Sequence, residues 1–336
     1  MPRRFHPFTT LAVGLLPVAA ACHGGHPQVA AVLLALAYGG ALLEFKTHTG
    51  HFQFAALVVI GTALGGVLDL AAGSFPLLTG ALAVAAVATV LRQMYMPRFT
   101  YVNHLWMEPA LLGIAAVAYP YTLSTAEPAW TTVVLPLLPL GAACGLSFGY
   151  IQDGMRMKRM AAKGYRIRIG FPAPDFELPD QSGVPSRLSD HRGKNPVLLI
   201  FVRGDWCPGC HMMLRTYERS RERFLEKGVH VIGIGPDSVD VNQDMVQRIG
   251  VGYQLLSDAQ QRVSQRYGVV YDNPIIELAV DYAQGIPLPA SFLVDIDGVV
   301  RYVSRPDRVG EFLDPTLIFG VLDRLPQRPV TEGRAA

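Results

Sequence analysis

The chain has 336 residues, of which half are hydrophobic and 17% are charged, and its net charge is +2. This length predicts about two domains. Because the net charge is small and no basic patch is interleaved with aromatic residues, nucleic-acid binding is not indicated. The four cysteines are too few for a small disulfide-stabilised scaffold.

Charged residues are rare in the first 150 residues, where only nine occur. A membrane-spanning helix needs ~20 mostly apolar residues. Six stretches approach this length, near residues 5–22, 27–45, 52–71, 75–91, 105–121 and 131–151. The sequence therefore predicts an all-α polytopic membrane bundle of about six helices at residues 1–152.

The positions of Lys and Arg predict an orientation for this bundle. With the N-terminus inside, nine Lys and Arg residues flank the inner ends of the stretches, whereas the loops near 23–26, 72–74 and 122–130 have none. We therefore expect an integral protein of the bacterial inner (plasma) membrane, with the lipid bilayer as a partner and the C-terminal domain facing the cytoplasm. Alternatively, the first 22 residues are a signal sequence that ends at a lipid-modified Cys22.

Residues 153–168 alternate basic and apolar side chains and predict a basic juxtamembrane linker. Histidines 48 and 51 can share a helical face with Glu44, which would allow a metal or haem site. Loop histidines are the simpler interpretation, so no metal and no bound cofactor are predicted.

From residue 169 to residue 328 the pattern changes to that of an α/β domain, and residues 329–336 predict a flexible tail. Apolar runs at 196–202 and 229–234 are typical of buried parallel strands. Amphipathic helices are predicted at 207–227, 239–249, 260–267 and 314–325. Strands at 290–294 and 299–303 flank Asp297-Gly298, which is a strong hairpin signal.

Cys207 and Cys210 are separated by two residues at the predicted start of a helix. The helix dipole and the unpaired N–H groups favour an anion there, which lowers the pKa of a thiol. One thiol can then attack a substrate while the other closes an intramolecular disulfide. A structural zinc site would need four ligands, and His211 is the one histidine nearby. Two buried, inert cysteines remain an alternative.

Four motifs in this half occur together in a known family. They are Gly170–Asp180, Leu188–Lys194, Phe201–Cys210 and Pro287–Gly298. Over about residues 168–327 the chain resembles the redoxin superfamily, and within it the AhpC/TSA peroxiredoxin-like branch. The resemblance implies a thioredoxin-like fold and a thiol-dependent antioxidant oxidoreductase. Its redox centre would be the Cys207–Cys210 disulfide, with no other cofactor.

The resemblance leaves two activities open. In thioredoxin-like reductases of protein disulfides the first cysteine attacks, which here is Cys207. In peroxiredoxins the attacking cysteine follows a Thr by three positions, which maps to Cys210 with Cys207 at the Thr position. Peroxiredoxins also keep an Arg where this chain has Pro289, and Arg203 can take over that role. Either activity needs a thiol electron donor, which the sequence does not identify.

The remaining expected site residues support the cysteines. Pro208 suits the first turn of a helix, Trp206 is expected to pack over the motif, and Asp205 is a candidate for proton transfer. By resemblance, Pro289 lies where thioredoxin-like proteins keep a cis-proline. A third hypothesis is a membrane transporter or scaffold with a redox-sensing domain.

Overall fold

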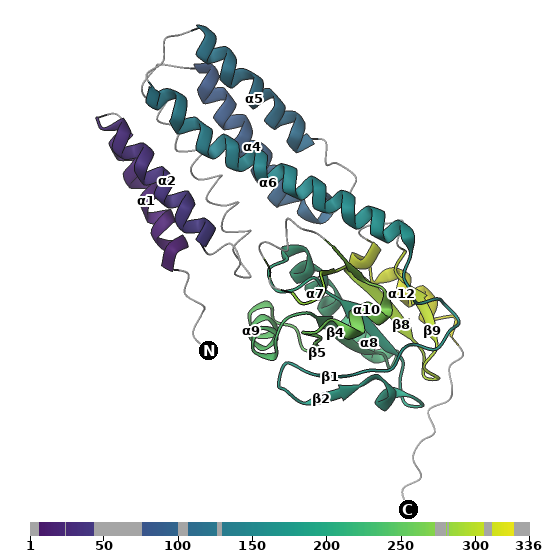
Figure 1. Ribbon diagram of the computed structural model, residues 1–336. Helices are drawn as coiled ribbons and strands as arrows, with labels where there is room; N and C mark the ends of the chain where they lie inside the picture. The colour runs from purple at the N-terminus through teal and green to yellow at the C-terminus, as the bar shows by residue number, and fades with distance from the viewer. Residues whose placement is uncertain are drawn as a thin grey trace, which may run out of the picture.

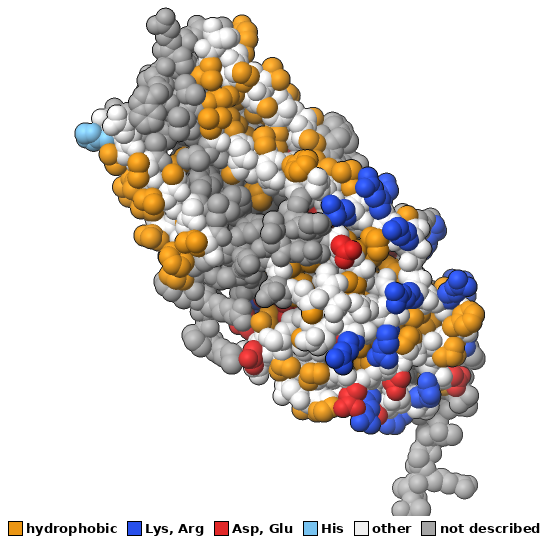
Figure 2. Space-filling model, viewed as in Figure 1, with side chains coloured by type: hydrophobic (Ala, Val, Ile, Leu, Met, Phe, Trp, Pro, Cys, Tyr) orange, Lys and Arg blue, Asp and Glu red, His pale blue; other side chains and the backbone are white. Residues whose placement is uncertain are grey.

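The computed structural model describes residues 7–23, 25–43, 76–99, 107–125, 130–272, 280, 282–305 and 311–325. The chain forms a group of helices that is followed by an α/β domain, and helix α6 runs between the two (Figure 1). On the face shown in Figure 2, hydrophobic side chains gather over the helical part, whereas the charged ones lie at its lower end and on the α/β domain.

Small side chains line the contacts between the N-terminal helices. These helices are α1 (Pro7–His23), α2 (Pro27–Leu43), α4 (Pro76–Phe99), α5 (Met107–Thr125) and α6 (Trp130–Lys163). Helix α1 packs on α2, and α4 packs on α5. The buried core that they share is mostly alanine, including Ala37, Ala85 and Ala115. Alanine favours helix formation and allows two helices to approach closely.

The predicted membrane bundle is wrong. Among the described residues, none of the helices combines the length and the apolar character that crossing a membrane requires. Helices α1 and α2 have 17 residues each, which gives a length of about 26 Å against a hydrocarbon core of ~30 Å. Alanine supplies much of each apolar stretch, but its methyl group contributes little hydrophobic transfer free energy. The stretch at 52–71 lies outside the described residues.

The expected orientation and the lipid-bilayer partner depended on those spans and therefore lose their support. Helix α6 continues to Lys163, across the boundary that the sequence predicted at residue 152. Its C-terminal part packs on the α/β domain, where Met157 belongs to the main hydrophobic core. The helical group and the α/β domain are thus joined by one continuous helix (Figure 1).

The central sheet has five strands in the order β5-β4-β3-β8-β9. The bounds of these strands are β3 (Val197–Phe201), β4 (His230–Gly235), β5 (Gln254–Ser257), β8 (Ala290–Val294) and β9 (Val300–Val303). Strands β3, β4 and β5 are parallel, whereas β8 and β9 are antiparallel to their neighbours. Strand β3 lies in the centre, and all five of its residues are buried. Its C-terminal end therefore delivers the following loop directly to the cysteines.

Most of the predicted elements of this domain are present. Helix α9 covers Val239–Ile249 as predicted, α10 covers Arg262–Tyr267 and α12 covers Thr316–Leu322. The helix predicted at 207–227 is divided at Ser220 into α7 (Pro208–Arg219) and α8 (Arg221–Glu226).

Several short elements were not predicted from the sequence. They are β1 (Glu177–Pro179), β2 (Pro185–Arg187), β5, β6 (Val270–Tyr271), β7 (Ile286–Pro287) and the 3-10 helices Leu188–His191 and Glu311–Leu313. Strands β1 and β2 pair with each other, as do β6 and β7. These paired segments flank the central sheet and do not interrupt it.

Candidate active site

Cys207 and Cys210 lie at the start of α7, directly after the loop that follows strand β3. Cys207 is the N-cap residue with extended backbone angles, and Pro208 occupies the first turn. The carbonyl of Cys207 accepts hydrogen bonds from the N–H groups of Cys210 at 3.0 Å and His211 at 3.3 Å. This geometry directs the positive end of the helix dipole at the first cysteine, as the sequence predicted.

The two thiols are buried and inequivalent. Cys207 is 2% exposed and Cys210 is fully buried, and both are free thiols. A hydrogen bond from Cys210, helped by the charge of Arg203, lowers the pKa of Cys207 to about 6. Burial raises the pKa of Cys210 well above its usual value, although the N–H of Arg203 donates to its Sγ at 3.2 Å. The surroundings therefore make Cys207 the more acidic thiol of the pair.

The guanidinium of Arg203 is buried beside the cysteines, and its two terminal nitrogens are bonded to neighbours. Two of its nitrogens contact the carboxylate of Asp153 on α6, at 2.7 and 2.9 Å. One of them also donates to the hydroxyl of Tyr271 at 2.7 Å. The guanidinium stacks on the ring of Trp206, whose centroid lies 4.6 Å away. Arg203 is therefore a buried component of the site, and not a surface arginine at a strand end.

Asp205 anchors a second polar cluster at the start of α7. Its carboxylate accepts two hydrogen bonds from Arg248 at 2.6 and 2.8 Å, and it lies 2.9 Å from Nε2 of His211. Asp205 is 1% exposed, so these partners compensate the burial of its charge. This pairing makes Asp205 a structural anchor of the loop.

Asp237 extends this cluster toward the loop backbone. It accepts hydrogen bonds from the N–H of Asp205 at 2.7 Å and from the hydroxyl of Tyr282 at 2.9 Å. Burial of the carboxyl raises the pKa of Asp237 to about 6. The pKa of Asp237 is therefore close to that of Cys207, so the two groups change protonation over the same pH range.

Pro289 precedes strand β8 and is buried. No cis peptide bond occurs among the described residues, so the expected cis-proline is wrong. Pro289 lines a small hollow together with Met157 and Ala161 of helix α6. Helix α6 therefore lies beside the segment where the resemblance placed the cis-proline.

The structure thus brings together most of the residues that the sequence proposed. Cys207, Cys210, Arg203 and Trp206 are neighbours, and Pro208 begins the helix. Sequence reasoning missed Asp153 and Tyr271, which hold Arg203, and also missed Asp237 and Tyr282. One signal pointed to Asp153, because it is the single acidic residue between Trp130 and Lys163.

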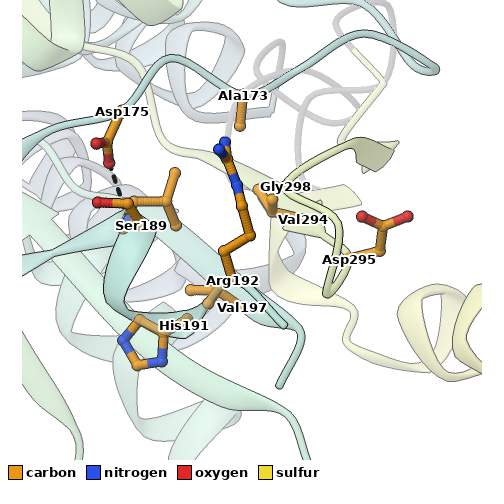
Figure 3. A pocket seen from close by; sticks show the side chains of 10 residues that line it. Ala173, Asp175, Ser189, His191, Arg192, Val197, Val294, Asp295 and Gly298 are labelled. Atoms are coloured by element: carbon orange, nitrogen blue, oxygen red, sulfur yellow. Dashed lines mark hydrogen bonds between the residues drawn. The ribbon is translucent and has the colours of Figure 1, made fainter. Parts of the chain in front are cut away.

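A second pocket lies at the other end of the sheet. It is lined by Ser189, Arg192, Val197 and Gly298 among others, and the N–H of Ser189 donates to Asp175 at 2.9 Å (Figure 3). Val197 begins strand β3, whereas the cysteines follow its end, so the pocket is separated from the thiols by the length of that strand. In the part of the chain that the structure describes, no cluster of three or more His, Cys, Asp or Glu side chains is arranged to hold a metal.

A buried dithiol at a helix N-terminus, after the central strand of a mixed α/β sheet, defines a thiol-dependent redox enzyme. The chain belongs to the AhpC/TSA family, whose model matches residues 169–303. A putative peroxiredoxin bcp of Coxiella burnetii is 33% identical over 137 residues, which cover 41% of this chain and 87% of that protein. The chloroplastic peroxiredoxin Q of Gentiana triflora is 26% identical over 224 residues, which cover 63% and 98% of the two chains.

Among solved structures, the chain is similar to peroxidoxin BcpB of Mycobacterium tuberculosis. The sequence identity is 26%, the TM-score is 0.42, and the match covers 48% of this chain and 100% of the other. The family assignment makes this chain a thiol peroxidase or oxidoreductase.

Proposed function

We propose that this enzyme reduces hydrogen peroxide or a small organic hydroperoxide, and that Cys207 is the attacking thiolate. The observation that carries this proposal is the asymmetry of the two thiols: Cys207 is the N-cap residue of α7 and its pKa is lowered to about 6, whereas burial raises the pKa of Cys210. The thiolate is the nucleophilic form of cysteine. The low exposure of both sulfurs favours an oxidant of a few atoms over a folded protein.

The first step transfers one oxygen atom. The Cys207 thiolate attacks the outer oxygen of the hydroperoxide, the O–O bond breaks, and Cys207 becomes a sulfenic acid. The alkoxide or hydroxide that leaves takes up a proton and departs as an alcohol or as water. The guanidinium of Arg203 stabilises the negative charge at the start of this step.

The second step closes the disulfide. The thiol of Cys210 attacks the sulfur of the sulfenic acid, and one water molecule is released as the Cys207–Cys210 bond forms. Two thiols of an external reductant then return the pair to the dithiol state and become a disulfide themselves. No prosthetic group enters this cycle.

Rapid mixing of the full reduced chain with hydrogen peroxide tests the proposal, with intrinsic tryptophan fluorescence as the readout, because Trp206 lies beside the motif. Cys207→Ser is expected to abolish the fast phase. Cys210→Ser is expected to keep it and to accumulate a sulfenic acid that a dimedone-type reagent traps at Cys207. A fast phase that survives in Cys207→Ser and disappears in Cys210→Ser would refute this order. That result would support attack by Cys210, which is the cysteine that corresponds to the attacking one in peroxiredoxins.

Reduction of protein disulfides is the second candidate function. It is favoured by the same asymmetry, because attack by the first cysteine is the order expected of thioredoxin-like reductases. Turnover of insulin disulfides, compared with turnover of peroxide under the same reductant, separates the two. Faster peroxide turnover is expected, since helix α6 lies beside Pro289 and both sulfurs are buried.

A further inference from the structure

Helix α6 reaches into the redox site although it lies outside the matched family segment. That segment begins at residue 169, whereas Asp153 is near the C-terminal end of the helix. Asp153 is 6% exposed and is the single acidic residue of α6. A carboxylate is rarely buried unless it is paired, and here its partner is an arginine 50 positions later in the chain.

The pairing of Asp153 with Arg203 is a two-point contact. One carboxylate oxygen lies 2.7 Å from Nη1, and the other accepts a hydrogen bond from Nη2 at 2.9 Å. Such a fork fixes the plane of the guanidinium as well as its position. The hydroxyl of Tyr271 donates to the same carboxylate at 2.7 Å and accepts from Nη2. The arginine is thus held from helix α6 and from strand β6 together.

The other side of Arg203 is directed at the cysteine motif. Its guanidinium lies over the ring of Trp206, its backbone N–H donates to Sγ of Cys210, and its charge acts on Cys207. One residue therefore connects the carboxylate on helix α6 to both thiols. The charge on Asp153 opposes that of Arg203, so the field at the sulfurs depends on both.

We propose that Asp153 is a positioning residue of the redox site, which fixes the guanidinium of Arg203 against the cysteine motif and balances part of its charge. Helix α6 then completes the site of the α/β domain. The balance has a chemical consequence, because the nucleophilicity of a thiolate falls as its pKa falls. An arginine without its carboxylate would overstabilise the thiolate and make it a weaker nucleophile.

Other charged and titratable groups surround Arg203 and Cys207, and a test must leave these groups unchanged. They are Cys210 and His211 on α7, Asp205 in the loop, Arg248 on α9, and the Asp237–Tyr282 pair. Asp153 itself is held by Arg203 and Tyr271. Asp153→Asn therefore changes the charge at one point and keeps the shape of the side chain, while Trp206 and Tyr271 still hold the guanidinium.

The experiment measures the pH dependence of Cys207 alkylation by iodoacetamide in the full chain, with the modified cysteine identified by mass spectrometry. Asp153→Asn is expected to lower the pKa of Cys207 by on the order of one unit. The plateau rate constant with hydrogen peroxide is expected to fall about threefold. In an Arg203→Met background, the same substitution is expected to shift the alkylation midpoint much less.

Asp295→Asn is the matched control, because Asp295 is also a nearly buried carboxylate paired with an arginine, Arg301, but lies at the far end of β3. It is expected to leave the Cys207 midpoint unchanged. A midpoint that is unchanged or raised in Asp153→Asn overturns the proposal, and so does an equal shift in the Arg203→Met background. The inference rests on Cys207 as the attacking thiol. Peroxide reactivity that survives in Cys207→Ser refutes the proposed function, whereas the alkylation midpoint tests Asp153 independently.

Discussion

Replacing Cys210 with alanine removes the largest cause of the low Cys207 pKa, which is the hydrogen bond from the second thiol. A hydrogen bond to a charged group contributes ~1.5–3 kcal/mol. One pKa unit corresponds to ~1.4 kcal/mol, so the pKa of Cys207 is expected to rise from about 6 to roughly 7–8. The charge of Arg203 remains and keeps the value below that of an ordinary cysteine.

The reaction rate at one pH is a poor measure of this change. At pH 7 the thiolate fraction would fall from ~90% to roughly 10–50%. The thiolate that remains would be roughly three- to eightfold more nucleophilic, because reactivity rises with pKa. The two effects nearly cancel, so the midpoint of a pH–alkylation profile is the informative quantity. Ultraviolet absorbance of the thiolate gives the same midpoint without a reagent.

Cys210→Ser is the matched control, since its hydroxyl can still donate to the Cys207 sulfur. Its midpoint is expected to stay closer to that of the wild type than the midpoint of Cys210→Ala. If both variants titrate together with the wild-type protein, the hydrogen bond does not set the Cys207 pKa. The reasoning that identifies Cys207 as the thiolate would then be refuted.

Two further predictions concern the loop beneath the cysteines. Gly204 has φ of 125°, and a Cβ there would overlap the hydroxyl of Tyr282, so Gly204→Ala is expected to lower the free energy of unfolding by at least about 2 kcal/mol. The control is Gly250→Ala, which has a positive φ but open space and should lower the free energy of unfolding by only ~1 kcal/mol. Equal losses for the two variants in denaturant titrations would contradict the overlap. Because the pKa of Asp237 is raised when folded, its stabilising contribution is complete below pH ~4 and is lost as the pH rises through about 6. The free energy of unfolding of the wild type relative to that of Asp237→Asn should therefore decline as the pH rises over this range. A difference that stays constant with pH would show that the pKa of Asp237 is not raised in the folded protein.

Local patterns predicted the elements whose signals are contained in a few residues. The apolar run at 197–201 became the central strand β3, and the periodicity of 239–249 became α9. The sequence does not indicate the break at Ser220, because apolar residues such as Tyr217 and Leu225 recur on both sides of it. After the break, Phe224 is buried whereas Leu225 is 55% exposed.

The membrane prediction failed because composition does not distinguish apolar side chains that face lipid from those that face another helix. In helices α1, α2, α4, α5 and α6, buried side chains such as Ala37 and Ala85 lie between helices. A run of alanines satisfies an apolar count, yet it suits close helix packing equally well. Helices α1 and α2 have 17 residues each, close to the ~20 that a membrane span needs, so length did not separate the two possibilities.

The site itself divides into a part that was predictable and a part that was not. The CxxC spacing and Pro208 act within one helical turn, so the sequence alone indicates a polarised thiol. The pKa that Cys207 reaches also depends on Arg203, whose carboxylate partner comes from a helix that the family motif does not include. The same motif on another chain, without Asp153, would carry a more strongly stabilised and less nucleophilic thiolate. The reactivity of this dithiol is therefore a property of helix α6 and the α/β domain together.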